Sequence, residues 1–377
     1  MHHYIDKIPS PCFVIEERTL RRNLELIHKV QQEAGVEIIL AFKGFAMWSV
    51  FDIVSEYITG AAASSLNEAR LSFEEMKVKA HTYCVGINPQ EIDDLLNYSS
   101  HLTFNSLGEF NKYKDKAITK GISCGIRINP GFSTVKTELY NPASPYSRLG
   151  LTSGSSLIHL PEGIEGIHFH SLCENDSFAL EKTLVIAEEK FGHLIKQAKW
   201  INMGGGHLMT KEGYDTKHLI SLLKSFKKKY DIHIILEPGS AFAWQTGYLL
   251  STILDIVENN DVKTAILDVS FTCHMPDCLE MPYKPEITGA TDPISGKPTY
   301  RLGGNSCLAG DFMTAYSFDN KLKVGDKVIF EDMIHYTMVK TTMFNGVKHP
   351  SIGIWTKDDS FKLIREFNYE DYKNRLS

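Results

Sequence analysis

The 377-residue sequence lacks the features that would assign it to a specialised class of protein. No stretch approaches the ~20 consecutive apolar residues of a membrane-spanning helix, and no low-complexity linker or internal repeat is visible. The N-terminal segment MHHYIDKIPS carries no pattern of a signal or transit peptide, so we expect a cytoplasmic protein without membrane association. The seven cysteines are scattered and form no CxxC pair, which argues against both a disulfide framework and a structural zinc site.

A strong excess of charge of one sign is also absent. The chain has 40 basic and 46 acidic residues, a formal charge of −6. The lysine-rich segment KSFKKKY at 224–230 is typical of the solvated end of an amphipathic helix rather than of a nucleic-acid patch. We therefore expect no nucleic-acid partner.

The sequence does contain a repeated alternation of short apolar segments with longer stretches of helical periodicity. In stretches such as 65–77 and 178–198 apolar residues recur every three or four positions, which predicts helices with one buried face. Eight short β-branched or apolar segments are predicted as strands: 37–42, 59–64, 81–86, 101–106, 123–129, 165–170, 199–204 and 232–238. This alternation predicts an α/β fold, a closed parallel (β/α)₈ TIM barrel over residues 11–245, with a doubly wound sheet as the alternative.

The pattern changes after about residue 245. Short alternating runs separated by Gly, Asp and Pro replace the helical stretches, from 246–259 to 335–346. This pattern predicts an antiparallel β domain, a barrel or sandwich, over residues 246–377, with residues 1–10 as a candidate addition to it.

Polar residues follow the predicted barrel strands at their C-terminal ends, where barrel enzymes carry their chemistry. Each has an ordinary structural explanation: a lysine that reaches for solvent, a hydrogen-bonded core histidine, a tight turn or a helix cap. Their placement on one face favours a shared site instead. The residues concerned are Lys43, His168, His170, Gly204, Gly205, Gly206, His207 and Glu237.

Together these residues suit an aldehyde cofactor that has a ring and a phosphate. Apolar neighbours make Lys43 less willing to stay protonated, so it is a competent amine for a Schiff base. The backbone N–H groups of MGGGH (203–207) can cradle a phosphate, and Glu237 can keep a pyridine nitrogen protonated. His170 can stack on the ring. We expect His168 and His170 to point to opposite faces of their strand, and we expect no metal centre.

The motifs that carry these residues resemble the fold-type III pyridoxal-phosphate decarboxylases, the family of ornithine and diaminopimelate decarboxylases. The resemblance covers essentially the whole chain and both predicted domains. Three further segments, 138–150, 273–283 and 305–312, are most similar to the branch that decarboxylates carboxylated polyamines. The family motifs are ILAFKGF, GIHFH, NMGGGH, LEPGSA, GGNSCLAGD and HYTMVKTTMFNG, in this order along the chain.

The resemblance implies a role for each residue around pyridoxal 5′-phosphate. Lys43 holds the cofactor covalently, His170 stacks on its ring, and Glu237 pairs with the ring nitrogen. Cys307 matches a cysteine that enters the site from a second subunit, which implies a head-to-tail homodimer with shared sites and makes this thiol the expected proton donor. The residues expected at the phosphate are Gly205, Gly206 and Tyr336.

A polyamine carboxylate presents amines along an extended chain, so the distal pocket is expected to offer acidic groups. Asp277 is the candidate contact, with His274 beside it and Asp311 as a further candidate; a surface aspartate in a proline-rich loop is the alternative reading of Asp277. The sequence departs from its relatives at Ser240, where an arginine would meet the phosphate, and at Ala62, where ornithine enzymes carry an aspartate. Phosphate binding is therefore expected to depend on backbone and hydroxyl groups.

Three other functions remain open at this level. The same barrel and cofactor serve amino-acid racemases, and a barrel without a β domain can be a non-catalytic cofactor carrier. A decarboxylase that acts on lysine, ornithine, arginine or diaminopimelate is the main rival to a polyamine enzyme.

Overall fold

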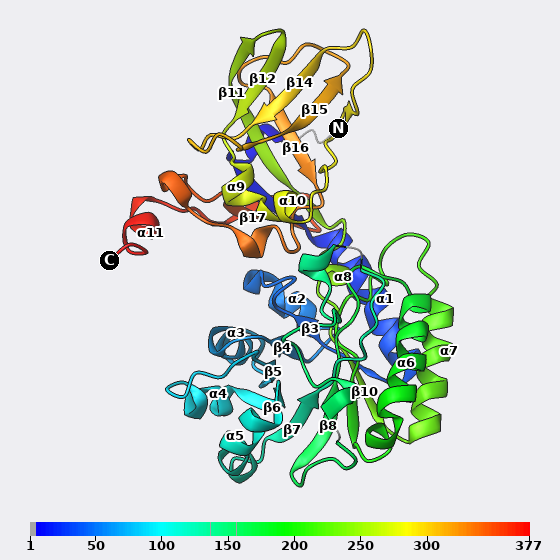
Figure 1. Ribbon diagram of the computed structural model, residues 1–377. Coiled ribbons are helices and arrows are strands. Elements are labelled where there is room, and N and C mark those ends of the chain that lie inside the picture. The colour runs from blue at the N-terminus through cyan, green and yellow to red at the C-terminus, as the bar shows by residue number, and fades with distance from the viewer. Residues whose placement is uncertain (1–4, 136, 156) are drawn as a thin grey trace. The chain divides into compact units, whose positions relative to one another are not determined.

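The computed structural model describes residues 5–135, 137–155 and 157–377. The chain divides into two compact units, coloured along the chain in Figure 1. The first, Arg21–Phe242, is here named the barrel unit. The second, named the β unit, joins the residues up to Leu20 with Ala243–Ser377.

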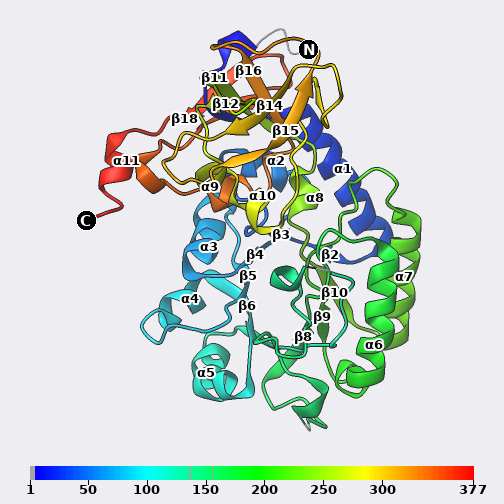
Figure 2. The same cartoon turned by 45° about the horizontal axis from the view of Figure 1, so that its top comes forward.

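The barrel unit is built on a ring of parallel strands, which Figure 2 shows with helices α3 to α7 on its outside. The strands pair in the order β2-β10-β9-β8-β7-β6-β5-β4-β3. They are β2 (Glu37–Ile38), β3 (Leu40–Ala41), β4 (Ala61–Ala63), β5 (Ala80–Tyr83), β6 (Ser99–Phe104), β7 (Ser123–Arg127), β8 (Ile164–His168), β9 (Trp200–Asn202) and β10 (His233–Leu236).

Two of these strands, β2 and β3, are successive pieces of one interrupted strand that closes the ring. The first piece pairs with β10 and the second with β4. At the interruption, the N–H of Ile39 donates to the carbonyl of Leu236 at 2.9 Å, and that of Leu40 donates to Gly60 at 3.0 Å. The predicted (β/α)₈ barrel is confirmed, and a strand lies within each of the eight predicted segments or overlaps it.

Helices connect the strands of the barrel unit. Side-chain caps mark several helix starts; the Asp176 and Asp215 carboxylates accept the N–H groups of Ala179 and His218. The lysine-rich segment 224–230 forms the last turns of α7, as predicted. The helices are α1 (Glu17–Ala34), α2 (Phe51–Ser55), α3 (Leu66–Leu71), α4 (Ile92–Tyr98), α5 (Leu107–Thr119), α6 (Ser177–Ile195), α7 (Thr216–Tyr230) and α8 (Ser240–Ala243), with a π-helical turn at Ser72–Met76 and 3₁₀ turns at Trp48–Val50, Glu138–Tyr140 and Ser153–Ser155.

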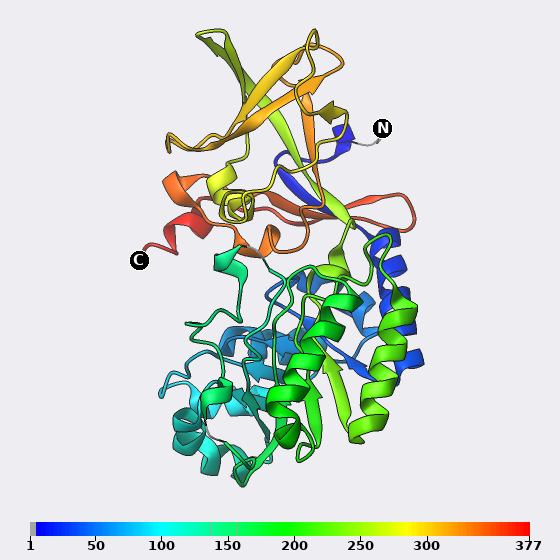
Figure 3. The same cartoon turned by 45° about the vertical axis from the view of Figure 1, so that its right-hand side comes forward.

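The β unit contains a mixed sheet, and Figure 3 shows its long strand β11 beside β12. Most pairs are antiparallel, as predicted, but β1 with β17 and β12 with β14 are parallel. The path β13-β15-β14-β12-β11-β1-β17-β18 is joined by β16, which pairs with β11. The strands are β1 (Cys12–Glu16), β11 (Gly247–Asn259), β12 (Val262–Leu267), β13 (Ala290–Thr291), β14 (Thr299–Gly303), β15 (Phe312–Phe318), β16 (Lys327–Glu331), β17 (Ser351–Trp355) and β18 (Phe361–Arg365).

The unit boundaries differ from the predicted ones because of β1. This strand lies between β11 and β17 in the sheet of the β unit, so the barrel unit begins at Arg21 and not at residue 11. The second boundary falls between Phe242 and Ala243, close to the predicted division after residue 245. A strand segment alone does not reveal which of two sheets it joins.

Short helices occupy the remaining segments of the β unit. The alternating β run predicted at 335–346 is wrong: the chain there forms two 3₁₀ turns and includes Tyr336 and Asn345 in the left-handed region, with φ of 42° and 57°. No helix among the described residues has the length and apolar character to cross a membrane. The helical segments are α9 (Phe271–His274), α10 (Pro276–Glu280) and α11 (Tyr369–Lys373), with 3₁₀ turns at Ile5–Lys7, Met338–Lys340 and Phe344–Gly346.

Candidate active site

Lys43 stands just after β3, in a turn that packs directly on the turn after β10. A Cβ atom on Gly44 would lie 2.8 Å from the Cα of Gly239, so neither position has room for a larger residue. This backbone contact holds Lys43 beside the segment that carries Glu237. Two residues almost two hundred positions apart in sequence are thereby brought to one end of the barrel.

Lys43 contacts His170 in a geometry that defines the protonation of both groups. The Nζ atom of Lys43 lies 3.3 Å from Nε2 of His170, and the backbone N–H of Gly205 donates to Nδ1 of the same ring at 2.9 Å. Because Nδ1 accepts a hydrogen bond, we assign the ring proton to Nε2. That N–H can only donate, so Lys43 accepts it as a neutral amine.

The surrounding protein favours the same protonation states. The pKa of Lys43 is lowered, and the largest cause is desolvation by the surrounding protein. Part of the side chain nevertheless remains exposed to solvent. Burial and then Lys43 lower the pKa of His170 well below 6.5. A neutral lysine beside a neutral histidine is the state in which the lysine nitrogen can attack an aldehyde carbon.

Glu237 follows β10 and is held by Asn202 at the end of β9. The Nδ2 group of Asn202 donates to Oε1 of Glu237 at 2.6 Å, while its Oδ1 accepts the N–H of Gly204 at 2.9 Å. Burial raises the pKa of Glu237, and the hydrogen bond from Asn202, Lys43 and Arg127 act in the opposite direction. The other oxygen, Oε2, lies 3.8 Å from Nε2 of His168.

The glycine loop after β9 depends on the absence of side chains. Gly204 and Gly206 have φ of 70° and 88°, and a Cβ on Gly205 would lie 2.4 Å from the carbonyl oxygen of Glu237. Two glycines are predicted to bind phosphate. The N–H of one of them, Gly205, already donates a hydrogen bond to His170. Gly206 is partly exposed, and its N–H makes no hydrogen bond to any described residue. Gly206 is therefore the better anion donor of the pair.

Ser240 replaces the expected phosphate-binding arginine at the start of α8. Its side chain is buried, and its hydroxyl lies 3.4 Å from the carboxylate of Glu174. Ala62 lies buried in β4, where no side-chain charge can take the place of the aspartate of the ornithine enzymes. The replacement at Ser240 leaves the barrel unit with backbone and hydroxyl groups at the predicted phosphate position.

The other predicted residues belong to the β unit, and among them Asp277 has the geometry of a binding group. Its Oδ2 accepts hydrogen bonds from the hydroxyls of Tyr283 at 2.8 Å and Thr337 at 2.7 Å. Oδ1 is buried without a hydrogen-bond partner among the described residues. The aspartate is only 8% exposed, unlike a surface residue of a mobile loop. Asp277 is therefore a fixed carboxylate with one oxygen unpaired among the described residues.

Asp311 instead organises the loop that carries Cys307. Its Oδ1 accepts the backbone N–H of Phe271 at 2.7 Å, and its Oδ2 accepts that of Ser306 at 3.1 Å. Both oxygens are thus engaged by the main chain, so the geometry does not favour the substrate contact expected of Asp311. The thiol of Cys307 is exposed, and its backbone N–H donates to Asn345 at 2.9 Å.

His274 and Tyr336 also lie in the β unit. His274 has no exposed surface, and its Nδ1 accepts the N–H of Ser270 at 3.1 Å. Burial lowers its pKa to about 3, so it is a neutral core residue and its geometry does not favour a substrate contact. Tyr336 is partly buried in a left-handed backbone conformation.

Sequence reasoning missed Asn202 beside Glu237, and it gave no role to two buried strand-end residues, Arg127 and His168. The expectation that His168 and His170 point to opposite faces was wrong, because residues two apart in extended chain share a face. The position of Arg127 and His168 at strand ends was the signal that the sequence offered. Arg127 places its guanidinium 4.7 Å from the ring centre of Tyr83, and its Nε has no hydrogen-bond partner among the described residues.

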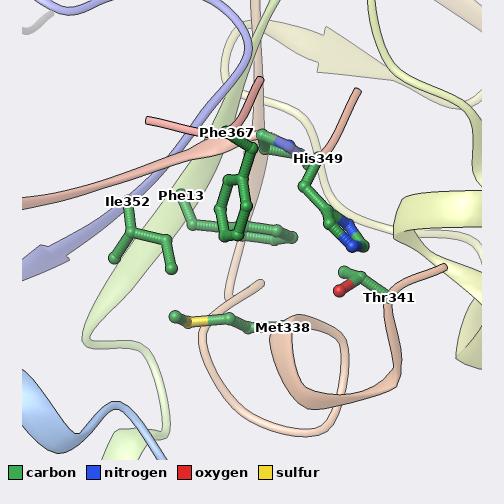
Figure 4. Close-up of a pocket in the computed structure, with 7 residues that line it drawn as sticks. Phe13, Met338, Thr341, His349, Ile352 and Phe367 are labelled. Atoms are coloured by element: carbon green, nitrogen blue, oxygen red, sulfur yellow. The ribbon is translucent and has the colours of Figure 1, made fainter. Parts of the chain in front are cut away.

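A pocket of about 160 Å³ lies within the β unit, between β1, β17 and the 3₁₀ turn at Met338–Lys340 (Figure 4). Phe13, Ile352 and Phe367 give it an apolar lining, and His349 and Thr341 are its polar residues. None of the predicted site residues lines it. We assign it no part in the chemistry.

Comparison with known families identifies the chemistry that this geometry serves. Residues 12–334 match the family described as pyridoxal-dependent decarboxylase, C-terminal sheet domain. The chain belongs to this family.

Relatives of this pyridoxal-dependent decarboxylase match it along its whole length. It is 50% identical to carboxyaminopropylagmatine decarboxylase of Synechocystis sp., over 99% of this chain and 96% of the relative. It is 44% identical to carboxynorspermidine/carboxyspermidine decarboxylase of Campylobacter jejuni, over 99% of this chain and 100% of the relative. The crystal structure of carboxynorspermidine decarboxylase with norspermidine from that organism has a TM-score of 0.90 at 42% identity, covering 98% and 100% of the two chains.

The residues of the barrel unit fit the pyridoxal phosphate that this family uses. Lys43 presents an amine whose pKa is lowered by burial, as attack on an aldehyde requires, and Oε2 of Glu237 lies 3.8 Å from His168, outside hydrogen-bond distance. The loop at Gly204–Gly206 packs too closely on neighbouring backbone to accept a side chain, and the N–H of Gly206 makes no hydrogen bond to any described residue. An amine, a carboxylate and a free backbone donor thus lie at one end of the barrel.

Proposed function

We propose that this protein decarboxylates carboxynorspermidine and carboxyspermidine to norspermidine and spermidine. The observation that carries the proposal is the neutral Lys43 beside His170 and Glu237, in a chain whose full-length relatives act on carboxylated polyamines. Diaminopimelate decarboxylases match at only 23% identity, which supports a polyamine over a diamino acid.

The barrel residues have separate tasks in this reaction. Bound pyridoxal phosphate supplies a ring that takes up the electron pair left on the α-carbon when CO₂ departs. Lys43 would hold the cofactor through its amine, Glu237 would hold a proton on the ring nitrogen, and His170 would stack on the ring. The N–H of Gly206 would bind the phosphate, and Tyr336 is a further proposed phosphate ligand.

We further propose that the enzyme is a homodimer in which Cys307 of each subunit completes the site of the other. Cys307 donates the proton that the α-carbon takes up after CO₂ has left. Its exposed thiol, held on a loop ordered by Asp311, suits this task. The free state of all seven cysteines suits a reducing compartment, and we propose the cytoplasm.

Asp277 is the proposed contact for the distal ammonium group of the substrate. A buried carboxylate with two hydroxyl donors on one oxygen keeps its other oxygen for a cation, and a charged group there would satisfy it. A diaminopimelate carrying a second carboxylate would meet repulsion at the same place. The 50% identity to the Synechocystis relative makes carboxyaminopropylagmatine, with a guanidinium tail, the second candidate substrate.

The proposal is tested by measuring CO₂ release and kcat/KM of the purified enzyme with five compounds: carboxynorspermidine, carboxyspermidine, carboxyaminopropylagmatine, diaminopimelate and ornithine. We expect the two carboxylated triamines to exceed diaminopimelate and ornithine by at least about a hundredfold, because an unmatched charge in a buried pocket is costly. A higher kcat/KM for carboxyaminopropylagmatine would transfer the proposal to the second candidate. Inversion of an amino acid without CO₂ release would instead indicate a racemase.

A further inference from the structure

His168 is the most deeply buried ionisable residue next to Glu237, and nothing in the proposed reaction uses it. It is 2% exposed, and neither of its ring nitrogens has a hydrogen-bond partner among the described residues. A buried polar group without a partner costs free energy, so its retention at this position requires a reason. Its surroundings are specific: the Tyr83 ring lies 5.3 Å away between ring centres.

The carboxylate oxygen nearest to His168 is Oε2 of Glu237, which does not accept a hydrogen bond from Asn202. Nε2 of His168 lies 3.8 Å from Oε2 of Glu237, while Asn202 occupies Oε1 at 2.6 Å. Burial, followed by Arg127 and Lys43, lowers the pKa of His168 well below 6.5, so the ring is neutral and carries one N–H donor. Glu237 is the acceptor that this donor can reach after a small movement of either side chain.

We infer that His168 is a positioning residue that, together with Asn202, holds Glu237 as an anion aimed at the cofactor's ring nitrogen. The inference rests on the proposed role of Glu237. A carboxylate in this environment tends to take up a proton, and a protonated Glu237 is a poor partner for a protonated ring nitrogen. Two donors, one on each oxygen, oppose that uptake and restrict the rotation of the carboxyl group.

The test compares two ligands that differ only at the ring nitrogen: pyridoxal phosphate and its carbocyclic analogue, in which C–H replaces that nitrogen. Dissociation constants are measured for the wild-type chain, His168→Leu, which removes the donor, and His168→Gln, which keeps a neutral N–H donor. The ratio of the two constants isolates the contact with the nitrogen, because contacts to the aldehyde and phosphate cancel. His81→Leu, a buried histidine at the other end of the strands, is the matched control.

We expect His168→Leu to reduce the wild-type preference for pyridoxal phosphate by about tenfold or more, and His168→Gln and His81→Leu to keep most of it. If His168→Leu weakens the binding of both ligands equally, the preference is unchanged and the role of His168 is merely structural, which would overturn the inference. Unchanged binding of both ligands would overturn it as well. A wild-type chain that binds both ligands equally well would reject the role of Glu237 itself. The two failures are therefore distinguishable.

Discussion

Lys43 is the side chain on which the covalent chemistry depends. Its amine accepts a hydrogen bond from His170, and its pKa is lowered mainly by burial.

We expect Lys43→Ala to abolish covalent attachment of pyridoxal phosphate and to reduce turnover by at least about a thousandfold, since the amine that binds and releases the cofactor is lost. Borohydride treatment followed by mass spectrometry of the peptide checks the attachment. Lys29→Ala, on the exposed face of α1, is the control and should retain both attachment and turnover. Full turnover of Lys43→Ala would reject the mechanism.

Asp277 acts at the other end of the proposed substrate. We expect Asp277→Ala to raise KM for carboxynorspermidine by about ten- to a hundredfold and to change kcat much less, because the lost contact is a charge-assisted hydrogen bond remote from the reacting carbon. Steady-state kinetics measures both constants. Asp319→Ala removes an exposed aspartate of the same unit and should alter neither. An unchanged KM for Asp277→Ala would remove this residue from the site.

Among the structural elements, the glycine loop after β9 links the most site residues. It accepts and donates hydrogen bonds that position Asn202, His170 and Glu237, and its backbone packs against the carbonyl of Glu237. A side chain in this loop must therefore disturb several partners at once.

Gly205→Ala tests the loop. The new Cβ would lie 2.4 Å from a backbone carbonyl, so the loop must shift and the hydrogen bond to His170 must weaken. We expect a loss of about 1–3 kcal/mol in the free energy of unfolding and at least tenfold weaker binding of pyridoxal phosphate. Gly108→Ala in α5 is the control: its nearest neighbouring atom would be 3.9 Å away, and it should be neutral or stabilising. Equal behaviour of the two variants would contradict the packing described.

The fold as a whole carries several histidines that are kept neutral by burial. Burial lowers the pKa of His81 to about 3, of His207 to about 4 and of His274 to about 3. The His81 ring stacks on His101 with centres 3.9 Å apart, and its Nε2 lies 3.8 Å from Glu37. Protonating such a ring in the folded state would bury a charge.

The pH dependence of stability follows from the direction of these shifts. Each folded pKa lies below the unfolded value of about 6.5, so as pH falls through 6.5 the unfolded chain binds protons that the folded chain refuses. The free energy of unfolding should therefore fall steadily from pH 6.5 towards pH 4, by about 1.4 kcal/mol per pH unit for each such histidine.

Urea unfolding at intervals between pH 8 and pH 4 measures this slope. His81→Phe should make it shallower by the contribution of one histidine, while His159→Phe, at an exposed position, should leave it unchanged. A stability that is flat between pH 6.5 and pH 4.5 would mean that these rings take up protons in the folded state.

Local sequence patterns were sufficient to predict the barrel and the strand ends at which the candidate site lies. Whether a segment forms a strand or a helix can be predicted locally, because it depends on the spacing of the apolar residues within that segment. Lys43, His170 and Glu237 followed from one rule, that barrel strands end on a common face. The three successive glycines alone were compatible with a tight turn, and their position after a barrel strand is what indicated a phosphate loop.

How these groups are held depends on contacts that local patterns do not specify. The hydrogen bond from Asn202 to Glu237, the approach of His168 to the same carboxylate at 3.8 Å and the use of both Asp311 oxygens by the main chain all join groups far apart in sequence. β1 belongs to the β unit because it pairs with β11 on one side and with β17 on the other. Local patterns specify what each segment can form, whereas the choice among its partners is made by packing of the whole chain.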